Sequence, residues 1–229
     1  MPFFSVITIT KNNQCGFDKT KRSIESQSFD DFEWVVVDGD VEPDNGIYDA
    51  MNKGMTRASG DYIVFMNAGD EFANEHTLKT VFDNHDGADL IYGDAIEGGH
   101  VKHARSHQLI AQGLFTYHQS IYYKRCVIGD LRYDETYPIA ADYKFTAQFL
   151  FKDARAHYIP QPLCVFDVGG VSQLNAKQGR VEQSRIRREL GINAPFTPYR
   201  QYIGWTIKKY CEPLYWCIKK IDRTRFSVL

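Results

Sequence analysis

Residues 46–70 read GIYDAMNKGMTRASGDYIVFMNAGD, and this stretch decides the fold class. Its first half has apolar side chains at helical spacing, which predicts a helix over about 47–58 with the stripe Ile47, Met51 and Met55. Its second half, Tyr62–Met66, is a continuous apolar run that ends in Asn67-Ala68-Gly69-Asp70. Such a strand, apolar on both faces, is typical of a parallel sheet that helices cover on both sides.

The same pattern continues on both sides of this stretch. Phe4–Ile9 and Glu33–Val37 are two earlier apolar runs, and Phe17–Gln27 between them is predicted to be a helix. Strands and helices thus alternate, which predicts α/β architecture with a mostly parallel sheet and right-handed crossovers. Further along we expect helices over about 75–82, 141–151 and from 178 onward, strands over about 89–92, 157–159 and 163–167, and irregular structure over about 95–138.

Composition excludes several classes of protein. The 229 residues are 43% hydrophobic and 24% charged, as in a packed globular chain, and no run approaches the ~18 apolar residues of a membrane span. Five cysteines without a CxxC pair argue against a zinc site or a disulfide framework, so a reducing compartment is expected. The start, MPFFSVITIT, has no basic leader, so we expect a cytoplasmic protein that is soluble or peripherally attached.

The net charge of −2 hides two parts of opposite sign. Residues 1–175 contain 15 basic and 25 acidic side chains, a net charge of −10, whereas residues 176–229 contain 12 basic and 4 acidic, a net charge of +8. We therefore divide the chain into an α/β part, 1–175, and a basic helical extension, 176–229. The overall charge gives no reason to expect a nucleic-acid partner.

Three successive predicted strands end in polar clusters, which are Thr10-Lys11-Asn12, Asp38-Gly39-Asp40 and Asn67-Ala68-Gly69-Asp70. The carboxyl ends of strands form the ligand crevice of an open α/β sheet, and carboxylates there suit a hard divalent cation with open positions for phosphate oxygens. Each cluster taken alone is equally well explained as a plain turn. The sequence has no GxxxxGK[ST], no GxGxxG that opens a helix and no GxSxG, which excludes the usual phosphate loops and a serine hydrolase elbow.

The order of FSVITITKN (4–12), FEWVVVDGD (32–40), the stretch at 46–70 and AADYKF (140–145) resembles the family 2 glycosyltransferases of the Rossmann-like GT-A fold. The stretch at 46–70 is especially similar to bacterial members that build polysaccharide, O-antigen and colanic-acid-type repeats. The resemblance covers about residues 3–170. It implies a nucleotide-binding half over about 1–95, an acceptor-side half over about 96–175, and a nucleotide-sugar donor, with UDP as the expected nucleotide.

The resemblance assigns donor binding to the strand ends and the helix between them. Asp38 takes the place of the acid that recognises the base and ribose, and Thr10 and Asn12 would line the nucleoside pocket. Asp49 and Lys53 lie between the base-binding and metal-binding strands. There Lys53 either neutralises diphosphate charge or is simply a solvated helix lysine.

The metal motif is where this sequence departs from the family pattern. Members commonly carry D-x-D, often as DxDD, where this chain has Asn67, Ala68, Gly69 and Asp70. Asp70 is therefore the candidate ligand for Mn²⁺ or Mg²⁺, and Asn67 is a neutral oxygen donor or a sugar contact. Because there are fewer formal charges, we expect weak metal binding until the donor diphosphate is present.

The resemblance places the catalytic base at Asp142, at the start of the helix predicted over 141–151. The helix dipole favours an ionised carboxylate there, although a helix cap is the alternative interpretation. As base, Asp142 would deprotonate an acceptor hydroxyl that attacks the anomeric carbon from the face opposite the diphosphate, which inverts that centre. His118 and Gln119 are expected either to line a sugar site or to be structural, and Asp94 is a further acceptor-side candidate.

The residue pattern of the extension predicts an amphipathic helix, which Pro213 interrupts or kinks. Its apolar stripe is Ile203, Ile207, Tyr210, Leu214, Cys217, Ile218 and Ile221, and its basic side is Lys208, Lys209, Lys219, Lys220 and Arg223. With Trp205 and Trp216, this pattern is typical of a helix that contacts an anionic membrane surface. The alternative is a pair of helices packed on the α/β part with a solvated basic face.

The sequence thus predicts an inverting hexosyltransferase that moves a sugar from a UDP-sugar to a lipid-linked saccharide, on the cytoplasmic face of the inner membrane. Two alternatives stay open. One is a nucleotidyltransferase of similar architecture, for which KNNQCG (11–16) is a poor phosphate loop. The other is a non-catalytic protein that binds sugar nucleotides.

Overall fold

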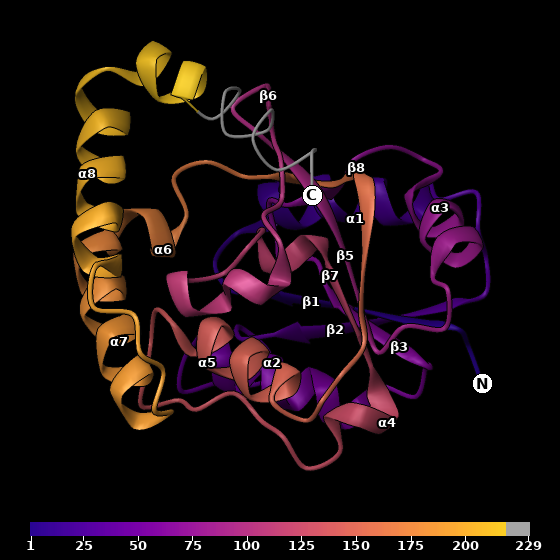
Figure 1. Ribbon diagram of the computed structural model, residues 1–229. Helices are drawn as coiled ribbons and strands as arrows, with labels where there is room; N and C mark the ends of the chain where they lie inside the picture. The colour runs from indigo at the N-terminus through magenta and orange to yellow at the C-terminus, as the bar shows by residue number, and fades with distance from the viewer. Residues whose placement is uncertain (219–229) are drawn as a thin grey trace.

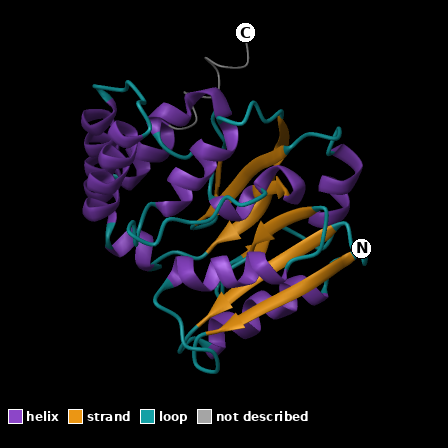
Figure 2. Ribbon diagram, turned by 90° about the horizontal axis from the view of Figure 1, so that it is seen from below, coloured by secondary structure: helices purple, strands orange, loops and turns teal. Residues whose placement is uncertain are grey.

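The computed structural model describes residues 1–218, with one sheet between helices on its two faces (Figures 1 and 2). Its strands are β1 (Phe4–Thr10), β2 (Phe32–Asp38), β3 (Tyr62–Phe65), β4 (Glu71–Phe72), β5 (Leu90–Glu97), β6 (His100–Lys102), β7 (Ile121–Lys124) and β8 (Ala156–Phe166). Its helices are α1 (Gln14–Glu25), α2 (Ile47–Arg57), α3 (Thr77–Asn84), α4 (Arg125–Ile128), α5 (Ala141–Leu150), α6 (Val171–Leu174), α7 (Ala176–Glu189) and α8 (Thr197–Tyr210), with short 3-10 turns η1 (His107–Gln112) and η2 (His118–Ser120).

The first three predicted strands pair in parallel, as expected. β1 pairs with β2 in a register that puts Thr10 opposite Asp38, and it pairs with β3 on its other side. Backbone bonds continue beyond β3, since Ala68 N donates to Ile9 O at 3.1 Å. The three polar strand ends therefore meet at one edge of the sheet.

The α/β class is confirmed, but the sheet is mixed rather than mostly parallel. Its order is β2-β1-β3-β7-β5-β8-β4, and β4, β6 and β7 make antiparallel pairs. β7 lies inside the segment that was expected to be irregular, because four residues are too few to show a strand pattern. β8 is one strand where two were expected, because a register shift beside Gly93 and Asp94 accommodates Pro160 and Gln161.

Two element boundaries differ from expectation in ways that affect the site. α1 begins at Gln14 because Asn13 caps it, with the Asn13 side chain accepting from Gly16 N at 3.0 Å. β5 continues past Tyr92 to Glu97. Asp94 is therefore a buried residue inside a strand and does not belong to a loop after it.

Buried side chains cover both faces of the sheet. On one face Ile7 of β1 packs in a cluster with Met51 and Met55 of α2. On the other face Val6 belongs to a cluster that includes Ile24 of α1. β1 is thus enclosed by β2 and β3 at its edges and by packed side chains on both faces, so its carboxyl end is a rigid platform for the site.

The extension packs beside the α/β part instead of standing free. α7 and α8 lie together as a separate layer (Figure 1), and α8 ends at Tyr210 before a new helical segment begins at Glu212. Pro213 therefore interrupts the helix as predicted. Trp216 is buried and stacks on His100 with ring centroids 4.7 Å apart, which anchors this segment to the β5–β6 hairpin.

Part of the predicted stripe and basic side, at Lys219, Lys220, Ile221 and Arg223, falls outside the described residues. Within residues 1–218, no helix combines the length and the apolar character that crossing a membrane requires.

Candidate active site

A cleft of about 1420 Å³ opens at the carboxyl edge of β1 and β3 and extends to α7 and α8. Six of the residues predicted to form the site line this cleft, namely Thr10, Asn67, Asp70, His118, Gln119 and Asp142. Five others do not line it: Asn12, Asp38, Asp49, Lys53 and Asp94. The cleft thus brings the strand ends, η2 and the start of α5 together around one space.

Asp38 and Asn12 shape the rim of the cleft through hydrogen bonds. Asp38 Oδ1 accepts from Asp40 N at 2.9 Å, and Asp40 Oδ2 accepts from Asn12 N at 2.7 Å. Asn12 has a φ of 50°, a left-handed conformation that Asn tolerates better than most residues. This network holds the ends of β1 and β2 in a fixed relation beside Thr10.

Asp49 and Lys53 support the loop at 43–46 from α2. Lys53 Nζ lies 3.1 Å from Asp49 Oδ2 and donates to Pro43 O at 2.8 Å, while Asp49 Oδ2 accepts from Asn45 N at 2.8 Å. The hydrogen bond from Asn45 N holds the pKa of Asp49 below its ordinary value. Beside this loop the lysine that lines the cleft is Lys11, whose Nζ lies 3.3 Å from Asp44 Oδ1 and which was given no role from the sequence.

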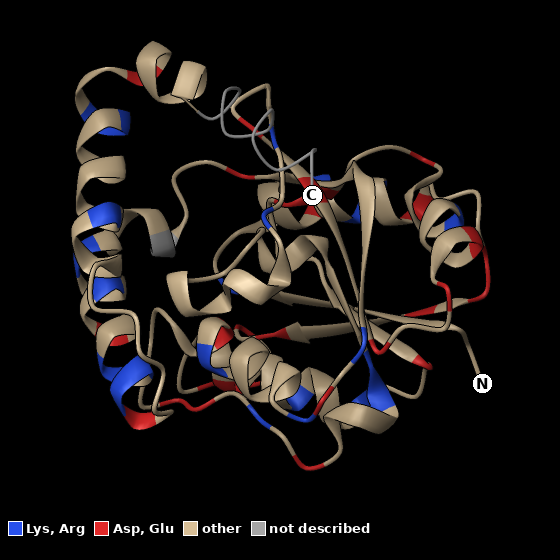
Figure 3. Ribbon diagram, in the orientation of Figure 1, with Lys and Arg blue, Asp and Glu red and all other residues tan. Residues whose placement is uncertain are grey.

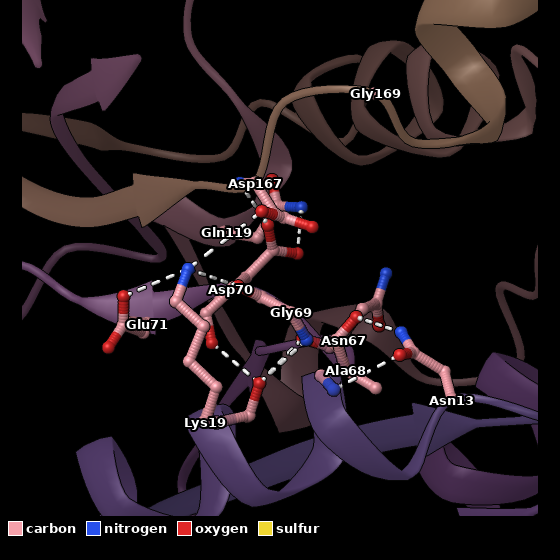
Figure 4. A network of polar contacts seen from close by, with 12 residues as sticks. Asn13, Lys19, Asn67, Ala68, Gly69, Asp70, Glu71, Gln119, Asp167 and Gly169 are labelled. Atoms are coloured by element: carbon pink, nitrogen blue, oxygen red, sulfur yellow. Dashed lines mark hydrogen bonds and ion pairs between the residues drawn. The ribbon is translucent and has the colours of Figure 1, made fainter. Parts of the chain in front are cut away.

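Asp70 is a buried carboxylate whose two oxygens are both hydrogen-bonded (Figure 4). Oδ1 accepts from Asp167 N at 2.9 Å, and Oδ2 accepts from Gln119 Nε2 at 2.6 Å. Burial raises the pKa of Asp70 from its ordinary value to about 6, and the two hydrogen bonds oppose that rise. Gln119 therefore contacts the proposed metal ligand directly.

Thr20 of α1 fixes the loop that carries Asp70. Its hydroxyl donates to Asp70 O at 2.6 Å and accepts from Gly69 N at 2.9 Å, and the residue is fully buried. Lys19, the preceding residue, donates to Gly69 O at 3.0 Å (Figure 4). The sequence analysis missed Thr20; its only signal was a polar residue on the same helix face as Ile24.

Asp167, which follows β8, is a second carboxylate beside Asp70 that the sequence analysis did not single out. It lines the cleft, and its side chain is 53% exposed. Its side chain lies close to Gly69 (Figure 4). A Cβ added to Gly69 would come within 2.8 Å of Asp167 Oδ2. The signal was its place at the end of a predicted strand, the same feature that marked the other clusters.

These residues suit a divalent cation. Asp70 and Asp167 supply carboxylate oxygens, and Asn67 Oδ1 is a buried oxygen without a hydrogen-bond partner among the described residues. Such oxygen donors are the ligands that Mg²⁺ and Mn²⁺ prefer. Within residues 1–218, no three His, Cys, Asp or Glu side chains form a complete metal site, so a cation here needs oxygens from a bound molecule as well.

Asp142 lies in the first turn of α5 and faces the cleft. Its Oδ1 accepts from Tyr143 N at 2.7 Å, and its Oδ2 lies 3.6 Å from His118 Nδ1. The N-cap position belongs to Ala140, so Asp142 is not the cap of this helix. His118 Nε2 is in turn 3.3 Å from Asn67 Nδ2, so His118 lies between Asp142 and the Asn67–Asp70 loop.

Asp94 does not reach the cleft, but His103 beside it does. His103 Nδ1 lies 2.7 Å from Asp94 Oδ2, and His103 lines the cleft where Asp94 is buried. Asp94, the residue predicted from the sequence, is thus in contact with the cleft-lining residue His103 but does not line the cleft itself.

Comparison with known proteins gives a matching family. Residues 40–154 match the family model described as Glycosyl transferase family 2. A PGL/p-HBAD biosynthesis glycosyltransferase of Mycobacterium bovis (strain BCG / Pasteur 1173P2) is 30% identical over 240 residues, which cover 88% of this chain and 91% of that protein.

Solved structures share the fold at low sequence identity. The crystal structure of S. aureus TarS 1-349 in complex with UDP-GlcNAc aligns with a TM-score of 0.65 and 18% identity, over 88% of this chain and 69% of that one. The same fragment in complex with UDP is covered over 65% of its length, slightly less than two thirds. The mannosyltransferase PcManGT from Pyrobaculum calidifontis, in complex with GDP-Man and Mn²⁺, aligns with a TM-score of 0.62 and 16% identity, over 96% of this chain and 73% of that one.

The Thr20→Val substitution tests whether Thr20 fixes the Asp70 loop. Because Gly69 N and Asp70 O would lose their buried partner, we expect a loss of about 1–3 kcal/mol in the free energy of unfolding. Urea unfolding measures this loss. Thr20→Ser keeps the hydroxyl and should stay close to the unsubstituted protein, as should Thr206→Val on the exposed side of α8. Equal destabilisation by Thr20→Val and Thr20→Ser would contradict the assignment.

Proposed function

Because the chain belongs to glycosyl transferase family 2 and has the GT-A fold, we propose that it transfers a hexose, with inversion, from a UDP-sugar to a lipid-linked saccharide in the synthesis of a bacterial surface polysaccharide. One observation carries the proposal. Asp142 and Asp70 face the same cleft, and the consecutive residues His118 and Gln119 contact one each. A carboxylate that can take a proton and a carboxylate that can hold a cation for the diphosphate thus line one cleft.

The donor is proposed to lie along the carboxyl edge of β1. The two structural neighbours described in complex with UDP-GlcNAc and GDP-Man support a nucleotide-sugar donor. Thr10 would contact the nucleoside directly, while Asp38 and Asn12 would contact it from the rim that they form. Asp49 and Lys53 would act through the loop at 43–46, which they hold against the cleft.

Asp70 and Asp167 are proposed to hold a Mn²⁺ or Mg²⁺ ion together with Asn67 Oδ1. The Mn²⁺ described in the PcManGT complex supports a divalent cation. When bound, such an ion neutralises charge on the leaving diphosphate. The protein's own part is to fix these oxygens through Gln119 and through the backbone of β8.

Asp142 is proposed to be the general base. Its Oδ1 is engaged by Tyr143 N, which leaves Oδ2 to accept the proton of the acceptor hydroxyl. As that oxygen bonds to the anomeric carbon, the bond from this carbon to the diphosphate oxygen breaks and its electron pair leaves with the diphosphate. Attack opposite the leaving group inverts the anomeric centre. His118 Nδ1 lies 3.6 Å from Oδ2, beside the oxygen proposed to take this proton.

The basic extension is proposed to bring the enzyme to the membrane that carries its acceptor. α8 exposes Tyr199, Tyr202 and Tyr210 together with Lys209 and Arg200. Aromatic and basic side chains on one exposed helix are the combination that an anionic lipid surface attracts. Trp216 takes no part, since it is buried against His100.

Asp142→Asn should keep donor binding and lose transfer. An amide cannot accept the proton, so we expect a fall in turnover of at least about a hundredfold, in line with the usual contribution of a general base. UDP-glucose, UDP-galactose and UDP-hexosamines are first screened by thermal shift with Mn²⁺ present, and UDP release from the most stabilising donor is then measured. Asp130→Asn, at an exposed position, is the control. Normal turnover by Asp142→Asn would refute the role, and affinity without turnover in the unsubstituted protein would favour a non-catalytic sugar-nucleotide binding protein.

UDP binding should depend on a divalent cation through Asp70 and Asp167. We expect EDTA to weaken UDP binding at least about tenfold, because the diphosphate would then face two uncompensated carboxylates. Calorimetric titration of UDP with and without Mn²⁺ measures the effect. Asp167→Asn is the cleaner variant, since its half-exposed side chain holds no buried network; it should reduce the Mn²⁺ effect, whereas Asp130→Asn should not. Tight UDP binding that EDTA leaves unchanged would remove the metal from the proposal.

The extension should bind anionic vesicles. Each basic residue near such a surface contributes about 1 kcal/mol, so reversing one charge by Lys209→Glu should weaken binding roughly tenfold or more. Sedimentation with phosphatidylglycerol vesicles measures the bound fraction. Lys79→Glu, an exposed lysine on α3, is the matched control and should have little effect. Failure of the unsubstituted protein to sediment with these vesicles would end the membrane proposal.

A further inference from the structure

We propose that His103, held by the buried carboxylate of Asp94, binds the phosphate that joins lipid to saccharide in the acceptor, in the part of the cleft that β6, α7 and α8 line. This inference rests on the proposed function, because it takes the cleft to be the place of transfer. It adds a binding site for the acceptor's anionic group and names the residues that form it.

Asp94 is buried and binds His103, so it does not contact a substrate itself. It is 2% exposed within β5, beside the register shift between β5 and β8. Three donors converge on its carboxylate, which are His103 Nδ1 at 2.7 Å, Ala104 N at 2.8 Å and Tyr158 OH at 2.6 Å. A charged group buried in this way needs such a set of partners, and the set fixes the position of each donor.

His103 presents one ring nitrogen to the cleft. Its side chain is 28% exposed and lines the cleft, while its Nδ1 faces Asp94. Among the described residues, Nε2 has no hydrogen-bond partner, so it is the atom available to a ligand. Asp94 thus positions His103 in the way that carboxylates orient the imidazole of many functional histidines.

The charges around His103 favour an anion. The cleft-lining residues that come from β6 and the segment after it, α7 and α8 include Lys102, His103, Arg105, Arg180, Arg200 and Lys208, and no Asp or Glu. The four acidic residues that line the cleft, Asp44, Asp70, Asp142 and Asp167, come from the loops of the α/β part and the start of α5. Figure 3 shows the basic residues gathered along α7 and α8. The two ends of one cleft therefore carry charge of opposite sign.

The basic end is also lined by apolar side chains. Ile203 and Ile207 of α8, Ile218 of the next helical segment and Leu114 face the same space. Inorganic phosphate makes no apolar contact with such a surface. An alkyl or isoprenoid phosphate would place its phosphate at His103 and bury its apolar chain against these residues. The observations therefore favour a phosphate that carries a lipid chain.

An ion pair between Lys208 and the buried Glu97 holds α8 beside this subsite. Lys208 Nζ of α8 lies 2.5 Å from Glu97 Oε1, which is 1% exposed at the end of β5. Gln173 donates to the same Glu97 oxygen at 3.1 Å. β5, α6 and α8 thus meet at Glu97, and this contact holds α8 in place along the cleft.

Calorimetric binding of decyl phosphate, kept below its micelle concentration and with the donor site filled by UDP and Mn²⁺, tests the proposal. We expect binding to the unsubstituted protein, at least tenfold weaker binding to His103→Ala, and an intermediate loss for Asp94→Asn. Donor binding, measured as the thermal shift with UDP, should be unchanged in both variants. His76→Ala, on the exposed surface, should behave like the unsubstituted protein. Because His103 is partly exposed, His103→Ala decides the question even if Asp94→Asn fails to fold.

Several outcomes would overturn the proposal. If decyl phosphate binds neither protein, or binds His103→Ala as tightly as the unsubstituted one, His103 has no such role. Equal binding of inorganic phosphate would remove the lipid chain from the site, and equal binding of decanol would remove the phosphate. If any of these results occurs while UDP release from a donor persists, the proposed function stands without this subsite. Absence of any donor binding would count against the function itself.

Discussion

The burial of the Asp70 carboxylate is the constraint on which the rest of the site depends. A carboxylate taken out of water costs several kcal/mol unless hydrogen-bond donors surround it. Here the donors come from Asp167 at the end of β8 and from Gln119 in η2, which are far from Asp70 in sequence. Satisfying one charge therefore brings the end of β8 and the η2 turn to the carboxyl edge of β1 and β3. The same convergence places His118 against Asp142, so a requirement of folding also arranges the residues proposed for catalysis.

The near-neutral charge of the chain is the sum of an acidic α/β part and a basic extension, and both parts line the cleft. The α/β part supplies the acids that surround the proposed diphosphate and cation, and the extension supplies three of the six basic residues named for the other end, which are Arg180, Arg200 and Lys208. An anionic donor at an acidic end needs a cation to compensate, whereas an anionic acceptor at a basic end does not. Two anionic substrates can thus occupy one cleft without sharing a counter-charge. The ion pair of Lys208 with the buried Glu97 joins these two parts.

Local patterns in the sequence were enough for the fold around 46–70, because a stripe such as Ile47, Met51 and Met55 and a run such as Tyr62–Met66 report burial directly. The resemblance then supplied Asp142 and Asp70, and the structure brings them to one cleft, though their roles stay proposals. Thr20 and Asp167 could not be found in this way. They meet the Asp70 loop across 50 and 97 residues of chain, and such contacts depend on how the helices and strands pack. Asp94 was found by its place near a strand end, but only three-dimensional packing reveals that His103 stands between it and the cleft.

The glycine at position 69, where the family's metal motif commonly has an acid, is related to the position of Asp167. Where members commonly have acids, this chain has Asn67 and Gly69 ahead of Asp70. Gly69 adopts a φ of 110°, which favours glycine, and even a Cβ there would come within 2.8 Å of Asp167 Oδ2. The space that a side chain at 69 would fill is thus taken by a carboxylate from another strand. An acid at position 69 would strain the backbone and would force the Asp167 side chain to move. The proposed metal site is therefore described better by residues that are neighbours in space, Asp70 and Asp167, than by four consecutive residues of the sequence.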